Sequence, residues 1–276
     1  MPAGRCALCL EDKTLIESHL MSAGLYALCH APDSDPVMVS EEVMMRTGRE
    51  LKHPLLCSDC DGSLSVKGEN WVLPLLARME GDFLLYEMLT EFPPDAEDKG
   101  SALYATVKNP TIKGEDITHF AMGIFWKAAV HSWRGSKSEP MIDLGSYEEP
   151  VRQFLRGKSE FPKKMALTVG VCSPPVRAIT FIHPYRGSTR NVHTFIFNVP
   201  GVQFMLSVGN QVSEDMKRLS LVPGSARVIV VTDLNDTIFD RIRAATTRAK
   251  IARNLQKYMK ESKEYADYVQ RRKEKK

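Results

Sequence analysis

Two Cys-x-x-Cys pairs constrain this chain more than any other feature of its sequence. Cys6 and Cys9 form the first pair, and Cys57 and Cys60 form the second. A Cys-x-x-Cys turn doubles the backbone back and presents two thiolates to one ion, so two such turns can supply the four ligands of a tetrahedral zinc site. We therefore expect Cys6, Cys9, Cys57 and Cys60 to bind one structural zinc ion.

The composition limits the setting in which these cysteines act. No run approaches 18 uninterrupted apolar residues, and residues 1–13 contain no apolar stretch like the centre of a signal peptide. These observations predict a cytoplasmic protein with no membrane partner. In a reducing compartment, paired cysteines favour metal binding over disulfides, and the other two cysteines, Cys29 and Cys172, stand alone in the sequence.

The apolar pattern that follows the cysteines predicts an α+β fold. Apolar residues recur at helical spacing over residues 82–92 and 117–133. Five short β-type runs come next, at residues 165–171, 177–183, 193–199, 202–208 and 226–232. From Thr237 the spacing is helical again, with an apolar stripe on one side and many Arg and Lys residues on the other.

These patterns divide the chain into three parts. Residues 1–75 form the expected zinc-binding module, with a ββα or treble-clef-like fold. Residues 76–236 form an α+β body in which a helical middle precedes a mainly antiparallel β region, and residues 237–276 form a long basic C-terminal helix.

The basic charge is concentrated in the last part of the chain. The net charge is +3, yet residues 241–276 hold 13 Lys and Arg against four Asp and Glu, so the remainder is net acidic. A basic helix of this kind is suited to a polyanion, and we expect it to contact nucleic acid. The residues expected to make these contacts are Arg241, Arg248, Lys250, Arg253, Lys257 and Lys260.

The order of motifs in the first quarter of the chain resembles the HNH branch of the His-Me finger nucleases. The motifs are CALC at residues 6–9, ESHL at residues 17–20 and LLCSDCD at residues 55–61. The resemblance implies two strands and a helix around the zinc, with His19 at the end of the first strand as the general base. It also implies that Asp61, directly after the last cysteine, helps to bind a catalytic Mg²⁺ or Mn²⁺.

The same module is similar to the N-terminal Cys/His part of uncharacterised bacterial proteins that continue into a helical and β-containing body. These resemblances suggest a metal-dependent endonuclease acting on DNA or RNA, with a role in bacterial or phage defence. The sequence departs from the HNH pattern at Ser18, where the family has Asp, Glu or His, and it has no counterpart of the family's central asparagine. Glu69 and Glu17 are alternative carboxylates, but Glu17 should point to the opposite face of its strand from Ser18.

Two readings therefore stay open for the site and for the protein. His19 is either a catalytic base or a histidine that only hydrogen-bonds and packs within the module. The chain is either an HNH-like endonuclease or a catalytically inactive zinc-finger adaptor that binds nucleic acid or a protein partner. Cys29, His30 and His53 are second-choice zinc ligands, and a place in exposed loops without a metal-binding role suits them better.

Overall fold

The computed structural model divides the chain into two compact units. It describes residues 2–30, 36–39, 43–133, 139–187, 192–221, 227–247 and 249–261. The first unit comprises Met1–Leu28 and Glu50–Asn235, and the second comprises Cys29–Arg49 and Asp236–Lys276. The first unit contains both cysteine pairs and residues 76–235 of the segment predicted as the α+β body. The division of this part at residue 75 stays a prediction.

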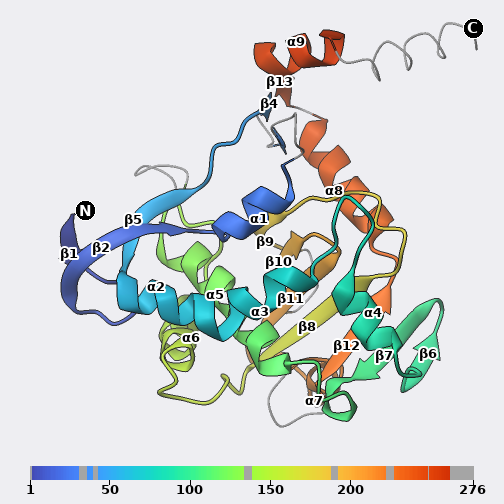
Figure 1. The fold of residues 1–276 in the computed structure, drawn as a ribbon. Coiled ribbons are helices and arrows are strands. Elements are labelled where there is room, and N and C mark those ends of the chain that lie inside the picture. Colours follow the sequence, from blue (N-terminus) through green and yellow to red (C-terminus); the bar gives the residue numbers. More distant parts are fainter. Residues whose placement is uncertain are drawn as a thin grey trace, which may run out of the picture. The chain divides into compact units, whose positions relative to one another are not determined.

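The N-terminal part of the first unit forms a small antiparallel sheet followed by a helix (Figure 1). The sheet has the strand order β1-β2-β5 and is built from β1 (Ala3–Arg5), β2 (Asp12–His19) and β5 (Lys52–Cys57). Leu15 lies opposite Cys57 and His19 lies opposite Lys52, and α2 (Ser58–Leu64) begins directly after β5. This arrangement confirms the ββα, treble-clef-like fold predicted for the N-terminal module.

Helices fill the middle of the first unit. After α2 the chain stays helical through η1 (Ser65–Glu69, a π-helical turn), α3 (Asn70–Val72) and η2 (Leu73–Leu75). The other helical elements are α1 (Ala23–Leu28), α4 (Leu84–Thr90), η3 (Thr106–Lys108), α5 (Gly114–Val130), η4 (Gly145–Tyr147), α6 (Glu148–Leu155) and α7 (Glu214–Arg218). A Cβ atom at Gly68 would lie 2.8 Å from the Phe120 amide nitrogen, so glycine permits η1 and α5 to meet.

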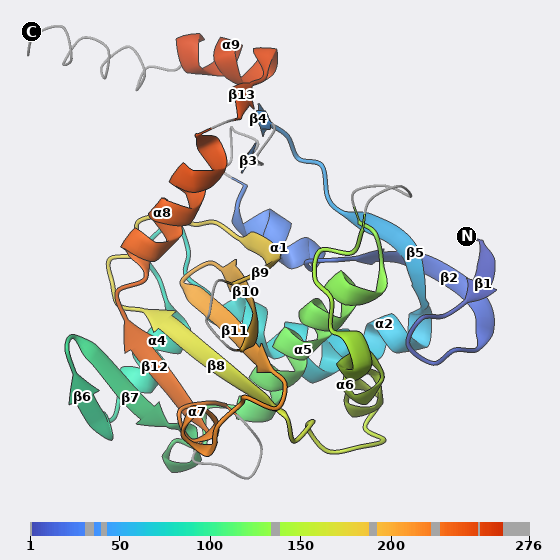
Figure 2. The same ribbon diagram turned by 180° about the vertical axis from the view of Figure 1, so that it is seen from behind.

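A seven-stranded sheet forms the second layer of the first unit, in the order β6-β7-β12-β8-β11-β10-β9 (Figure 2). Its strands are β6 (Ala96–Asp98), β7 (Ser101–Ala105), β8 (Met165–Cys172), β9 (Ile182–Arg186), β10 (His193–Val199), β11 (Val202–Val208) and β12 (Val228–Thr232). Only the β8 and β12 pair is parallel among these neighbours, which confirms the mainly antiparallel prediction.

One predicted strand is shifted. Residues 177–183 were expected to form a strand, but β9 begins at Ile182. The Arg177 amide donates to Asn235 Oδ1 at 2.8 Å, so this backbone group is held by a side chain instead of a strand ladder. Sequence pattern alone cannot reveal that competing bond.

The core of the first unit is an aromatic cluster between α5 and the large sheet. Phe125 of α5 lies edge-on to Phe197 of β10 with ring centroids 4.8 Å apart, and Phe197 stacks on Phe204 of β11 at 4.7 Å. Phe120 also contacts Phe204, at 5.8 Å. Because α5 is buried on almost all sides, it acts as a core helix, as its apolar spacing predicts.

The second unit joins an inserted segment to the C-terminal segment through a small sheet. The strand order is β13-β4-β3, from β3 (Val37–Val39), β4 (Val43–Arg46) and β13 (Lys250–Ile251). β13 pairs in parallel with β4, and β4 pairs antiparallel with β3. Two helices flank β13 in the sequence, α8 (Asn235–Thr246) and α9 (Arg253–Glu261).

The structure therefore corrects the expectation of one long basic helix from residue 237. The Thr246 and Thr247 hydroxyls both donate to the Arg243 carbonyl oxygen at 2.9 Å, where α8 ends. The following residues then bond to β4: Lys250 pairs with Val43, and the Ala252 amide donates to the Met44 carbonyl. Arg248 and residues 262–276 lie outside the described part of the chain.

Candidate metal centre

The four cysteines come from two local structures whose geometry the backbone fixes. Cys6 and Cys9 lie in the turn between β1 and β2, Cys57 ends β5, and Cys60 lies in the first turn of α2. The turn closes with the Leu10 amide donating to the Cys6 carbonyl at 2.8 Å, and Leu10 adopts a left-handed conformation with φ of 64°.

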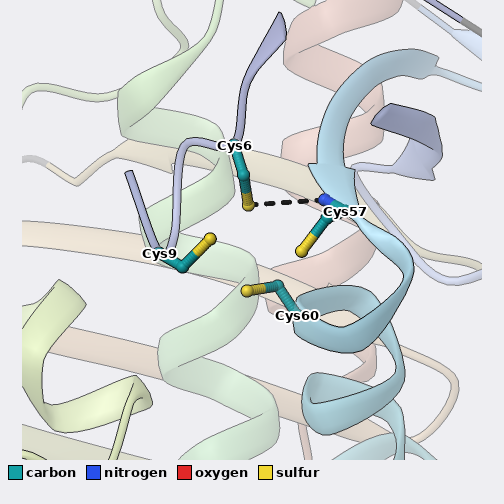
Figure 3. A group of neighbouring side chains, drawn as sticks. All are labelled: Cys6, Cys9, Cys57 and Cys60. Atoms are coloured by element: carbon teal, nitrogen blue, oxygen red, sulfur yellow. Dashed lines mark hydrogen bonds between the residues drawn. The ribbon is translucent and has the colours of Figure 1, made fainter. Parts of the chain in front are cut away.

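The four sulfur atoms converge on one point (Figure 3). All of them lie within 4.8 Å of one another. In a tetrahedral zinc site with Zn–S bonds of about 2.3 Å, the sulfur atoms are about 3.8 Å apart, so small side-chain adjustments suffice for coordination. Cys6 and Cys57 are buried, while Cys9 and Cys60 are partly exposed. The cluster is therefore within metal-binding distance.

Backbone amides favour the thiolate form of Cys6. Burial by itself would raise the pKa of the Cys6 thiol, but hydrogen bonds from the Cys9, Cys57 and Leu8 amides lower this pKa to about 7. The Cys57 amide lies 3.3 Å from the Cys6 sulfur. Burial raises the pKa of Cys9 and of Cys60. A metal ion would have to displace protons from these thiols on binding.

His19 lies at the end of β2 and contacts a carboxylate that sequence reasoning missed. His19 Nε2 is 2.8 Å from Glu50 Oε2, and the two side chains are 24% and 32% exposed. The backbone pairing of β2 with β5 extends one residue before the start of β5, because the Leu20 amide donates to the Leu51 carbonyl. The Leu51 amide donates to the Tyr26 hydroxyl at 2.9 Å. Glu50 precedes Lys52, the residue opposite His19, by two positions and so shares its face, a placement that follows only from the pairing of β2 with β5.

The residues beside His19 supply no second metal ligand. Ser18 is fully buried, and its hydroxyl has no hydrogen-bond partner among the residues that the structure describes. Glu17 lies on the opposite face of β2 from Ser18, as predicted, and so on the same face as His19. It pairs there with Lys52 at 2.9 Å, which lowers the pKa of Glu17. Glu69 is engaged elsewhere, since it accepts from Ser65 Oγ and lies 3.7 Å from Lys127 Nζ.

Asp61 lies in α2 one residue after Cys60, at the position that the HNH resemblance requires. No hydrogen bond or ion pair between described residues joins its carboxylate to His19. Within the described ranges, the four cysteines form the one group of three or more His, Cys, Asp and Glu side chains close enough to hold a metal ion. That group does not include the second-choice ligands Cys29, His30 and His53. The His53 ring instead contacts the His131 ring in a tilted arrangement, with centroids 4.2 Å apart.

The predicted nucleic-acid contacts fall partly on an exposed surface of the second unit. Lys250, Arg253, Lys257 and Lys260 are exposed, and we call these four residues the basic face. Glu261 is 3.9 Å from Lys257 Nζ. Arg241 is partly buried, and Arg248 lies outside the described residues. On the neighbouring strand, the Arg46 guanidinium lies over the Tyr258 ring, 4.4 Å from its centroid.

Comparisons of the chain with models of protein families, with curated proteins and with solved structures found no match. None of the helices in the described residues is long and apolar enough to cross a membrane.

Proposed function

We propose that the four cysteines bind one structural zinc ion, and that the module so formed carries an HNH-like site for hydrolysis of nucleic-acid phosphodiesters. Four cysteine sulfurs are the ligand set of a closed structural zinc site, which leaves no open position for substrate at the ion itself. The sulfur cluster supports the zinc part of the proposal. Any catalytic chemistry must therefore come from other residues of the module.

The contact between His19 and Glu50 is the observation that carries the catalytic part. An ionised carboxylate can only accept a hydrogen bond, so in neutral imidazole Nε2 keeps its proton at Glu50 and Nδ1 holds the free lone pair. Glu50 thus orients a base, the role for which the sequence offered no asparagine. Partial exposure leaves the imidazole accessible to water and substrate.

Asp61 is the residue that would bind a divalent ion in this proposal. Mg²⁺ is commonly held by one or two carboxylates, with water and substrate phosphate completing its coordination. When bound, such an ion offsets negative charge on the phosphate. Ser18 supplies no second negative charge, so Asp61 is the single carboxylate of this site. Binding of the divalent ion should therefore require the substrate phosphate as a further ligand.

Asp61→Asn is therefore expected to lower the cleavage rate while preserving zinc content. Part of the lost activity should return at high Mg²⁺ or Mn²⁺, because the amide still offers one neutral oxygen to the ion. The measurement is nicking of supercoiled plasmid across a series of metal concentrations. Asp59→Asn is the matched control in the same helical turn, where the carboxylate pairs with Lys13 at 3.3 Å. Equal activity of both variants at every concentration would contradict the role of Asp61.

A catalytically inactive adaptor is the second candidate, and the burial of Ser18 favours it. An HNH enzyme has a metal-binding side chain at that place, whereas the Ser18 hydroxyl is fully buried and makes no hydrogen bond to a described residue. In that case the zinc module would serve to bind nucleic acid or a protein partner without cleavage.

The basic face supports nucleic-acid binding under either candidate. Arg253, Lys257 and Lys260 recur at helical spacing on α9, away from the buried Leu255. Changing these three residues to glutamate should weaken nucleic-acid binding at low salt. The slope of log K against log salt should fall by roughly three, about one for each phosphate that the protein no longer neutralises.

Fluorescence anisotropy with labelled DNA and RNA across a salt series measures this effect. Lys158, Lys163 and Lys164 are exposed in the first unit and provide a matched triple change to glutamate. That control carries the same alteration of net charge, so it should retain more of the affinity and of the salt dependence. An identical loss in both triple variants would show that net charge alone governs binding.

A further inference from the structure

Arg152 of α6 reaches the cysteine turn from a distant part of the chain. Its Nη1 donates to the Leu8 carbonyl oxygen at 2.5 Å, and Leu8 lies between Cys6 and Cys9. Arg152 is 7% exposed and Leu8 is 2% exposed. The contact is therefore shielded from water, where a charge-assisted hydrogen bond is stronger than at the surface.

Glu149 fixes the direction of this guanidinium. Arg152 Nε and Nη2 donate to the two Glu149 oxygens at 2.6 and 2.7 Å, in a bidentate pair within one turn of α6. The hydrogen bonds from Arg152 hold the pKa of Glu149 at about 2. With one edge of the guanidinium held by Glu149, the remaining nitrogen is directed at Leu8.

The Leu8 carbonyl belongs to the same peptide unit as the Cys9 amide. The peptide unit is planar, so fixing its carbonyl oxygen also fixes the direction of its N–Cα bond to Cys9. Cys9 supplies one of the four clustered sulfurs, so the hydrogen bond from Arg152 constrains the backbone from which that sulfur projects.

We propose that Arg152 is a positioning residue of the metal centre, which orients the Leu8–Cys9 peptide and so holds the Cys6 and Cys9 thiolates in place for the ion. This inference rests on the zinc binding proposed above. Four thiolates around Zn²⁺ carry a net charge of about −2, and a cation nearby also offsets that charge. Because Glu149 neutralises much of the Arg152 charge, orientation is the larger contribution.

Arg152→Met tests the proposal, since methionine keeps an unbranched apolar stem but removes the hydrogen bonds. Zinc affinity, measured by competition with a chromophoric chelator, should fall by about 10–100-fold, as for other outer residues of metal sites. Co²⁺ substitution gives a second readout, because weaker visible d–d bands would report distortion of the tetrahedral thiolate shell. Arg156→Met makes the same change one turn later and should preserve both signals.

The possible results separate this inference from the zinc proposal. Wild-type protein that binds no zinc would overturn zinc binding itself. If Arg152→Met binds zinc as tightly as wild type and gives the same Co²⁺ spectrum, the role of Arg152 is overturned while zinc binding stands. If Arg152→Met does not fold, Arg152→Lys provides the test. Lysine keeps the positive charge but lacks the planar set of donors that binds Glu149 and Leu8 together. Wild-type zinc affinity in Arg152→Lys would therefore overturn the orienting role.

Discussion

Cys57→Ser is expected to release zinc and to unfold the N-terminal module. Structural zinc contributes about 10–16 kcal/mol in isolated zinc-finger peptides, and one serine removes a ligand that the other three thiolates cannot replace. The module also contributes Leu15, Leu56 and Leu64 to the core of the first unit. The rest of that unit should therefore lose stability but keep its seven-stranded sheet. Zinc content per chain and hydrogen exchange of residues 3–19 and 52–64 measure the two effects.

Cys29→Ser is the matched control, because it makes the same chemical change at a cysteine outside the cluster. That variant should retain about one zinc per chain and the exchange protection of the module. Acidification should release the metal from wild-type protein, because protons compete for the thiolates. Folded wild-type protein that contains no zinc, purified without chelators, would refute the zinc site.

His19→Ala is expected to abolish most nucleic-acid cleavage and to leave zinc content unchanged. Removing a general base commonly lowers the rate by about 10²–10⁴-fold, and His19 is not a member of the cysteine cluster. The assay is nicking of supercoiled plasmid and degradation of labelled single-stranded DNA and RNA, with and without a divalent ion. Nucleic-acid affinity should change little, which separates this variant from those of the basic face.

Two further variants sharpen the test of His19. Glu50→Gln should lower the rate less than His19→Ala, because the amide can still accept from Nε2 but no longer stabilises the imidazolium that forms. His53→Ala removes an exposed imidazole from the same strand pair and should cleave like wild type. If wild type and His19→Ala are equally inert on every substrate, the nuclease proposal fails and the adaptor becomes the better account.

The candidate site shows where sequence reasoning succeeded and where it failed. The four cysteines were predictable because local spacing carries the geometry of a Cys-x-x-Cys turn. Glu50 was missed although strand register places it on the His19 face, because that register becomes visible only when β2 is paired with β5. The contact between Arg152 and Leu8 joins residues 144 positions apart, which no local pattern encodes.

In the C-terminal segment, a contact with a distant strand overrides the structure that the local sequence pattern predicts. Helical spacing beyond residue 237 predicted one helix, yet Lys250 and Ile251 pair with a strand that lies far earlier in the sequence. Helix propensity is a weak preference, and bonds to a distant backbone can override it. The prediction failed because periodicity describes one segment at a time.

Local sequence patterns were enough to predict the features that depend on neighbouring residues: the two Cys-x-x-Cys pairs, strands β8, β10, β11 and β12 of the large sheet, and the buried helix α5. Side-chain period and turn chemistry are local properties, so they can be read without a partner. The pairing of the strands, the carboxylate that contacts His19 and the cation that contacts Leu8 became known from the three-dimensional structure alone. These contacts depend on how distant segments pack and which polar groups that packing buries, and burial is a property of the whole fold.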